Sequence, residues 1–187
     1  MALGYVRPAR PAEADAIARI QLGTWREAYR RLLPRHVLDA VEEPDLAAAW
    51  RTAITAPPTP RHRVLVAVEQ GEQEQLVGFA ASGPADAEAL APQEPPLPAD
   101  VAAVTELLVV PRWGRRGHGS RLLAASVDLW RGDGFRVAVA WAYERDPATR
   151  GFLQAAGWEP DGTVRALDVD DLLVNQLRLH VALTAGA

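Results

Sequence analysis

The sequence of 187 residues contains no cysteine. The chain therefore forms no disulfide, offers no thiolate to a metal and lacks a cysteine nucleophile, which excludes catalysis through a covalent protein thioester. Its four histidines, at positions 36, 62, 118 and 180, are scattered without the spacing of metal ligands. We therefore expect no metal site.

Lysine is missing as well, so all 20 basic side chains are arginines. A Walker A loop needs a lysine after its last glycine to reach the β- and γ-phosphates of a nucleotide, so an ordinary P-loop nucleotidase is excluded. The formal net charge is -4, and the arginines are most concentrated in one turn. Nucleic-acid-binding domains usually carry a basic stripe that neutralises phosphates, so we expect no nucleic acid partner.

Long apolar runs are also absent: none approaches the ~20 residues that span a bilayer, and Met1–Arg7 lacks the core of a signal peptide. These absences predict no membrane partner and a cytoplasmic location. A chain of 187 residues, 49% of them hydrophobic, is long enough for one buried core. We expect a single domain spanning residues 1–187.

The most informative segment that is present joins an apolar strand to a helix through a turn rich in glycine and arginine. Val104–Leu123 reads VTELLVVPRWGRRGHGSRLL. Its glycines allow close approach of the backbone to an anion, and the first N–H groups of the helix have no partner within the helix. Guanidinium groups suit phosphate oxygens. The segment therefore predicts a phosphate-binding turn, with positive charge from arginines 112, 115, 116 and 121.

The Rossmann fingerprint G-x-G-x-x-G does not fit this turn. Leu122 stands where that fingerprint has its third glycine, and no acidic residue closes the next expected strand, Val137–Trp141. The segment instead resembles the central motif of the GNAT superfamily of N-acetyltransferases: a strand, often a proline, then R/Q-x-x-G-x-G/A opening a helix. Val109-Val110-Pro111 and Gly117-His118-Gly119 carry the resemblance, with Gly114 at the position where arginine or glutamine is usual.

The resemblance extends along the chain in the family's order. Val6-Arg7-Pro8-Ala9 with Glu13–Ile17 is similar to the first strand and helix, and Trp25-x-x-x-Tyr29 through Leu33-Pro34 is similar to the end of that helix. Trp141–Gly157 is similar to the fifth strand and fourth helix. The resemblance implies an α/β fold of the GNAT, or acyl-CoA N-acyltransferase, type, with a central mixed sheet flanked by helices.

Periodicity and turn signals place the elements. Strands are expected at Tyr5–Pro8, Val64–Val68, Leu76–Ala81, Ala102–Val110, Val137–Trp141, Val164–Val169 and Leu172–Leu183. Helices are expected at Pro11–Leu32, within Pro34–Thr55, at Ser120–Arg131, and from Pro147, where Asp146 is the N-cap, to just before Gly157. Pro84–Asp100 is expected to be a loop.

In this family the turn binds the pyrophosphate of acetyl-CoA, the co-substrate that the resemblance implies. The residues that correspond to the family's CoA-binding positions are Leu108, Val109, Val110, Arg115, Arg116, Gly117, His118, Gly119, Ser120 and Asp146. By the same resemblance, backbone groups of the three strand residues hold the pantetheine arm and polarise the thioester. Their side chains are free to pack in the core.

The family's reaction is direct attack by a neutral amine on the thioester in a ternary complex, which requires a base and an acid. Glu106 is the candidate base because a carboxylate in a mostly apolar strand is costly unless it is used or paired; pairing with a surface arginine is the alternative. Leu153 stands where the family commonly has the tyrosine acid, and Tyr143 is the candidate substitute. His118 occupies a position that is usually apolar, so packing is favoured over catalysis.

Two functions remain open from the sequence. The first is an acetyl-CoA-dependent N-acetyltransferase acting on a primary amine of a small molecule or peptide. The second is a non-catalytic acyl-CoA-binding sensor with a degenerate site, which Leu153 favours. Trp25, Tyr29 and Trp50 either line an acceptor pocket or belong to the core, and the acidic side chains of Pro84–Asp100 either attract a cationic amine or are simply solvated. Both a monomer and a homodimer fit the final strands.

Overall fold

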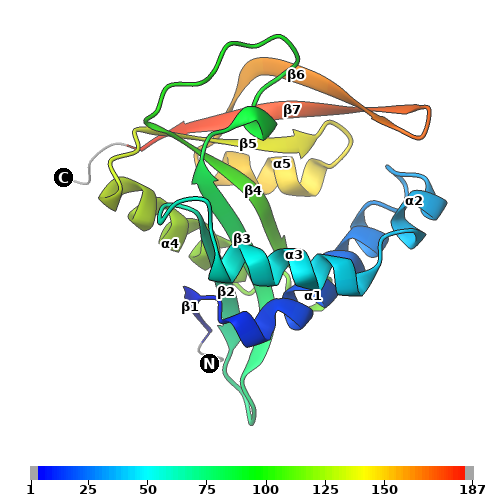
Figure 1. Cartoon of the computed structure of the whole chain (residues 1–187), viewed down its shortest axis with the longest axis vertical. Coiled ribbons are helices and arrows are strands. Elements are labelled where there is room, and N and C mark those ends of the chain that lie inside the picture. The colour runs from blue at the N-terminus through cyan, green and yellow to red at the C-terminus, as the bar shows by residue number, and fades with distance from the viewer. Residues whose placement is uncertain (1–3, 184–187) are drawn as a thin grey trace. The chain divides into compact units, whose positions relative to one another are not determined.

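The computed structural model describes residues 4–183, which form two compact units (Figure 1). Of the described residues, the first unit comprises 4–82 and 106–126, and the second comprises 83–105 and 127–183. The expected single domain stays a prediction. In chain order the elements are β1 (Tyr5–Pro8), η1 (Pro11–Glu13), α1 (Ala14–Ala28), α2 (Arg35–Asp39), α3 (Glu43–Thr55), β2 (Arg63–Glu69), β3 (Gln75–Pro84), η2 (Ala87–Ala89), β4 (Val101–Val109), η3 (Pro111–Trp113), α4 (His118–Gly132), β5 (Val137–Tyr143), α5 (Pro147–Ala155), β6 (Glu159–Val169) and β7 (Leu172–Ala182).

The strands form a seven-stranded sheet in the order β1-β2-β3-β4-β5-β7-β6. Strands β4 and β5 pair in parallel, whereas β1 with β2, β2 with β3, β5 with β7 and β6 with β7 are antiparallel. A mixed sheet of this kind confirms the α/β class expected from the sequence. All seven expected strands are present, and the longest, β6 and β7, form the C-terminal hairpin.

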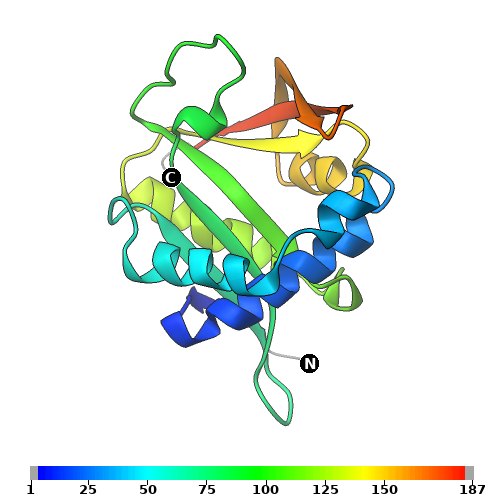
Figure 2. The same ribbon diagram turned by 45° about the vertical axis from the view of Figure 1, so that its right-hand side comes forward.

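In the first unit, α1 and α3 lie side by side over one face of the strands (Figures 1 and 2). Because successive side chains of a strand point to opposite faces, the valines at every second position of β2 lie on the same face. Helix α1 contributes isoleucines about one turn apart. The resulting core includes Ile17, Ile20, Val64, Val66, Val68, Phe79, Ala81 and Leu108. Trp25 and Trp50 pack against this core with part of each side chain exposed.

The second unit has its own small core, formed by Ala89, Val101, Ala103 and Val139. Helix α5 packs beside β5, and its start is the one expected: Asp146 accepts hydrogen bonds from the N–H groups of Ala148 and Thr149, both at 3.1 Å. Gly157 follows the helix with φ at +86°, a left-handed conformation that glycine adopts without strain.

Two helix boundaries differ from the sequence expectation. The first helix begins as a 3-10 turn at Pro11–Glu13 and its α-helical part ends at Ala28 rather than near residue 32, because the N–H groups of Leu32 and Leu33 bond to the carbonyl of Tyr29 in a turn. Helix α4 begins at His118 rather than at Ser120. The left-handed residue Gly117 immediately precedes it and sets that start.

Candidate functional site

The turn between β4 and α4 has the backbone shape of an anion-binding loop. Arg115 and Gly117 both have positive φ, at 60° and 80°, on either side of Arg116. The first hydrogen bond of the helix runs from Arg121 N–H to the carbonyl of Gly117, at 3.0 Å. The N–H groups of the residues between them, 118–120, therefore precede the first helical bond and are available to an anion at the positive end of the helix dipole.

The arginines of this turn divide into structural and exposed side chains. Arg121 points back toward the turn: its Nη2 donates to the carbonyl of Arg116 at 3.1 Å. The guanidinium of Arg116 lies 4.7 Å from the centre of the Trp113 ring, and its Nη1 lies 3.6 Å from Oε1 of Glu69. Arg115 is exposed. The structure thus holds the turn with Arg121 and leaves Arg115 and part of Arg116 open to a ligand.

His118 is buried beneath the turn, with 1% of its surface exposed. Its Nε2 lies 2.9 Å from Oε2 of Glu69, off the line of a good hydrogen bond, and its Nδ1 lies 3.2 Å from Nη1 of Arg121. Burial lowers the pKa of His118 more than Glu69 raises it. A neutral, enclosed imidazole fits the packing role rather than the catalytic one.

The strand that leads into the turn has buried side chains and a backbone in close contact with β3. Leu108 is 9% exposed and belongs to the core, and the N–H of Val110 donates to the carbonyl of Val77 at 2.9 Å. A Cβ at Gly78 would lie 2.6 Å from the carbonyl oxygen of Leu108, so only glycine permits this approach. The parallel pairing of β4 with β5 covers residues 101–104 and 137–140, and Leu108 and Val109 lie further along β4.

Glu106 lies in β4, one step before the core residue Leu108, and its side chain faces α1. Burial raises the pKa of Glu106 from 4.5 to about 7, and interactions with Gln21 and Trp25 oppose this rise only in part. The causes of the shift include no arginine or other charged group. A carboxylate with only neutral donors around it is half protonated near neutral pH, which suits a general base.

Gln21 affects the pKa of Glu106 and is bound by Trp50, and the sequence did not indicate either interaction. Gln21 is 4% exposed, and its Oε1 accepts a hydrogen bond from Nε1 of Trp50 at 2.7 Å. The signal that could have indicated Gln21 is a polar residue between Ile20 and Leu22 on the buried side of α1. Its partners lie 29 and 85 positions further along the chain, and helical periodicity does not reveal such contacts.

Tyr143, Asp146 and Leu153 belong to the second unit. Tyr143 ends β5, opposite Gln176 of β7, and it opposes the lowering of the Arg165 pKa that burial causes. Asp146 is occupied as the N-cap of α5, and it also accepts from the hydroxyl of Thr149 at 2.6 Å. Leu153 is 4% exposed and packs in the interior, so this position supplies no proton donor.

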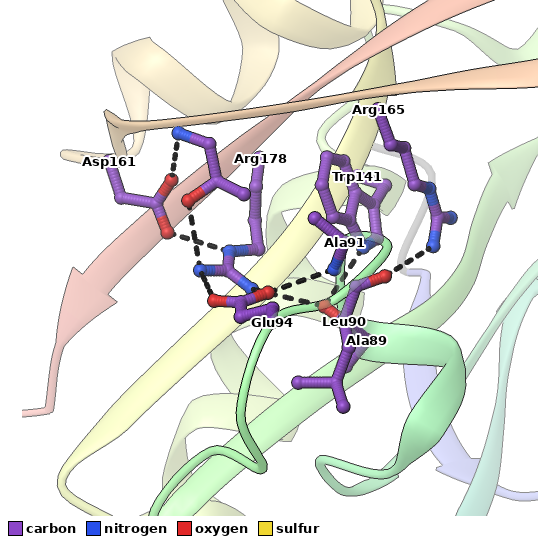
Figure 3. Close-up of polar contacts among 9 residues, drawn as sticks. Ala89, Leu90, Ala91, Glu94, Trp141, Asp161, Arg165 and Arg178 are labelled. Carbon is purple, nitrogen blue, oxygen red and sulfur yellow. Dashed lines mark hydrogen bonds and ion pairs between the residues drawn. The ribbon is translucent and has the colours of Figure 1, made fainter.

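The acidic segment before β4 is held by arginines rather than free to attract a cation. Figure 3 shows Arg178 between Glu94 and Asp161, with Nη2 to Oε1 of Glu94 and Nε to Oδ2 of Asp161 both at 2.6 Å. Asp86 accepts from the N–H of Glu88, at 2.9 Å. Glu94 is therefore not free to attract a cationic amine. We call the segment Pro84–Asp100 the anchored loop.

Within residues 4–183, histidine and acidic side chains form no group of three or more that could hold a metal ion. None of the helices in that range is long and apolar enough to cross a bilayer.

Residues 17–158 match the Acetyltransferase (GNAT) family model, and the chain belongs to this family of acetyltransferases. The family resemblance of the sequence is thereby confirmed.

The relatives agree with this assignment. The chain is 24% identical over 143 residues to YuaI of Bacillus subtilis (strain 168), described as an uncharacterized N-acetyltransferase, and the match covers 76% of this chain and 73% of that protein. It has the fold of the PaiA N-acetyltransferase of Thermoplasma acidophilum in complex with coenzyme A, at 11% identity and a TM-score of 0.71 over 96% of this chain and 99% of that one. YncA of Salmonella typhimurium, with its cofactor acetyl-CoA, has a TM-score of 0.67 at 17% identity over 98% and 96% of the two chains.

Proposed function

We propose that this protein is an acetyl-CoA-dependent N-acetyltransferase that acetylates a primary amine of a small molecule or peptide. The observation that carries the proposal is the turn before α4, where left-handed Arg115 and Gly117 precede free N–H groups at a helix start. That geometry suits the pyrophosphate of coenzyme A. The structures of PaiA with coenzyme A and YncA with acetyl-CoA support it, since they share the fold.

In the proposed reaction, the neutral amine attacks the thioester carbonyl carbon directly in a ternary complex. The C–N bond forms, the C–S bond breaks, and the amine gives up a proton to Glu106, directly or through a water. The backbone of Leu108, Val109 and Val110 holds the pantetheine arm and polarises the carbonyl. The thiolate of coenzyme A takes a proton from Tyr143 or from water, since Leu153 offers none. Asp146, the N-cap of α5, is also assigned to the residues that bind coenzyme A.

Binding of coenzyme A can be tested with two matched glycines. Gly117→Ala and Gly134→Ala each force a side chain into a left-handed position, at φ of 80° and 83°, so both lose about 1 kcal/mol of stability. Only Gly117 lies in the turn. We expect Gly117→Ala to weaken acetyl-CoA binding at least tenfold in a calorimetric titration, while Gly134→Ala binds as the wild type does. Equal affinity in both variants would contradict the proposed CoA site.

Catalysis is tested by free-thiol release from acetyl-CoA with a panel of amines, amino acids, polyamines and short peptides. Release that depends on the added amine establishes the transferase and identifies its acceptor class. The second candidate function, an acyl-CoA sensor, is favoured by the buried Leu153 at the position of the usual acid. Tight binding of acetyl-CoA with no release on any amine would support that sensor and contradict the enzyme.

A further inference from the structure

Glu69 is a buried acidic residue that the proposed mechanism does not use. It ends β2 and is 5% exposed, and a buried carboxylate is costly unless other groups pair with it. Two groups of the proposed phosphate-binding segment lie against it: Nε2 of His118 is 2.9 Å from Oε2, and Nη1 of Arg116 is 3.6 Å from Oε1. One carboxylate therefore reaches both the turn and the first residue of α4.

Arg121 determines which nitrogen of His118 carries the proton. Nη1 of Arg121 lies 3.2 Å from Nδ1 of His118, and a guanidinium can only donate, so Nδ1 is the acceptor in this bond. The proton of the neutral imidazole is then on Nε2, the nitrogen next to the Glu69 carboxylate. The ring thus links a cationic side chain on one side to an anionic one on the other.

A second bond of Arg121 turns these contacts into a closed network. Its Nη2 donates to the carbonyl oxygen of Arg116 at 3.1 Å, so Arg116 is held through its backbone by Arg121 and through its side chain by Glu69. Arg116 stands between the left-handed residues Arg115 and Gly117. A residue such as Arg115, with φ at 60°, persists in that conformation only where surrounding contacts hold it. We call the four linked residues the Glu69 network: Glu69, Arg116, His118 and Arg121.

The Glu69 network is enclosed at His118 and open at Arg116. A Cβ at Gly4 would lie 2.8 Å from both Cε1 of His118 and Nη1 of Arg121, so a larger residue there would push against both side chains. At the other end, the guanidinium of Arg116 lies 4.7 Å from the centre of the Trp113 ring, and its side chain is 54% exposed. The network therefore has a fixed interior and an exposed end at the turn.

We propose that Glu69 is a positioning residue for coenzyme A: through His118 and Arg116 it holds the turn in the shape that presents the N–H groups of residues 118–120 to the pyrophosphate. This inference rests on the proposed function, in which the turn binds that group. A negative side chain near an anion site repels the ligand, so Glu69 assists binding only by what it holds. Removing its charge should therefore weaken binding, whereas charge alone predicts the reverse.

The test compares Glu69→Gln with Glu72→Gln, which removes the same charge from the exposed connection between β2 and β3. Glu69→Gln keeps the length of the side chain but loses the ion pair with Arg116. We expect it to raise the Kd for coenzyme A about tenfold in a calorimetric titration. Its kcat at saturating acetyl-CoA should stay within about twofold of the wild type, since Glu69 acts on binding. An affinity equal to that of Glu72→Gln, or higher, overturns the proposal.

A double-mutant cycle tests whether Glu69 acts through His118. His118→Phe keeps a ring in the interior but removes both nitrogens. Because both changes open the same network, the Kd of the double variant should be no higher than that of the weaker-binding single variant. Effects that multiply would show that the two residues act independently, and would overturn the proposed route.

The His118 ring gives a readout in the wild-type protein, which needs no variant to fold. Its nitrogen NMR shifts should show the proton on Nε2, and this preference should be lost in Arg121→Met. A neutral ring protonated on Nδ1 in the wild type would contradict the network and overturn the proposal.

Failure of this inference differs from failure of the proposed function. A wild-type protein that binds no coenzyme A contradicts the proposed function, and the role of Glu69 falls with it. Binding that is weakened in Gly117→Ala but unchanged in Glu69→Gln keeps the turn as the coenzyme A site and overturns the role of Glu69 alone.

Discussion

The two units treat partly buried carboxylates in opposite ways. In the second unit, Glu94 and Asp161 lie on either side of Arg178, whose side chain is 5% exposed, so one positive charge is shared by two negative ones (Figure 3). In the first unit, the side chains that oppose the rise in the pKa of Glu106, Gln21 and Trp25, are both neutral. The same chemical group is thus paired in one place and left without a counter-charge in the other.

The pKa values follow this difference. The Arg178 guanidinium lowers the pKa of Glu94, and for Asp161 hydrogen bonds from Thr163 and Arg178 outweigh the opposing effect of burial. For Glu106 burial prevails and the pKa rises to about 7. A fully paired cluster stabilises a loop and stays charged, whereas a carboxylate without a cation exchanges protons near neutral pH. The paired cluster therefore fits a structural role, and Glu106 fits the role of base that we propose for it.

Arg178→Met should give the largest effect on stability. The variant removes the buried guanidinium and leaves the partly buried Glu94 and Asp161 without a cation, and losing one partner of a buried cluster costs about 3–5 kcal/mol. The measurement is the free energy of unfolding in urea. Arg136→Ala is the control: the Arg136 side chain is 83% exposed and lies 3.9 Å from Asp100, so its loss should cost less than about 0.5 kcal/mol. Similar losses in the two variants would remove the contrast.

Glu106→Gln should give the largest effect on turnover. Glutamine keeps the shape but accepts no proton, so we expect kcat to fall about 100-fold while the affinity for acetyl-CoA stays unchanged. Amine-dependent thiol release and a binding titration measure the two quantities. If turnover survives, another group is the base; if affinity falls as far as kcat, Glu106 acts in binding.

The same substitution should stabilise the protein in a pH-dependent way. The folded state raises the pKa of Glu106 from 4.5 to about 7, so it binds the proton more tightly than the unfolded chain does. Stability therefore falls as pH rises across that window, and Glu106→Gln removes a penalty of about 1–3 kcal/mol at pH 8 that is absent at pH 4. Unfolding at both pH values checks this, and a gain of equal size at both would contradict the raised pKa.

For Glu94 and Asp161 we expect the opposite dependence of stability on pH. Their folded pKa values lie below their ordinary values, so their contribution is fully present above about pH 4.5 and is lost as pH falls through the folded values. In Arg178→Met this acid-sensitive part of the stability should disappear. A stability difference between wild type and Arg178→Met that does not shrink below pH 4 would show that packing, rather than charge, accounts for the loss.

We expect the smallest effect on stability at Arg165 of β6, the second arginine that binds the anchored loop. Arg165 donates from Nε to Gln176 and from Nη1 to the carbonyl of Glu88, both at 2.7 Å, and its guanidinium lies 4.1 Å from the centre of the Trp141 ring. Lysine keeps the charge but not the two-pronged donation, so Arg165→Lys should cost about 1 kcal/mol in urea unfolding. A loss as large as that of Arg178→Met would mean that the loop depends on Arg165 instead.

Local signals predicted the elements well, because a proline, a glycine or a capping side chain acts within a few residues. Asp146-Pro147 correctly predicted the start of α5, and the short apolar run Val64–Val68 correctly predicted β2. The phosphate turn was visible for the same reason, since its glycines and the start of its helix are contiguous in the sequence.

Contacts between distant segments were out of reach. Glu94 binds Arg178 across 84 positions, so the acidic segment could equally be interpreted as free. His118 likewise lies 2.9 Å from Glu69, a residue of β2. Glu106 was identifiable as a candidate because a charge in an apolar strand is costly, but the side chains of α1 that affect its pKa were not. The sequence thus indicated a candidate base and a candidate phosphate-binding turn, and the fold supplied their surroundings.

The measurement that tests the central claim most directly is the pH dependence of kcat/KM for amine-dependent thiol release, in wild type and Glu106→Gln side by side. The account predicts that the wild-type rate rises through an inflection near pH 7, where Glu106 loses its proton, and that the inflection is absent from the residual rate of Glu106→Gln. The same inflection in both proteins would contradict the assignment of Glu106 as the base.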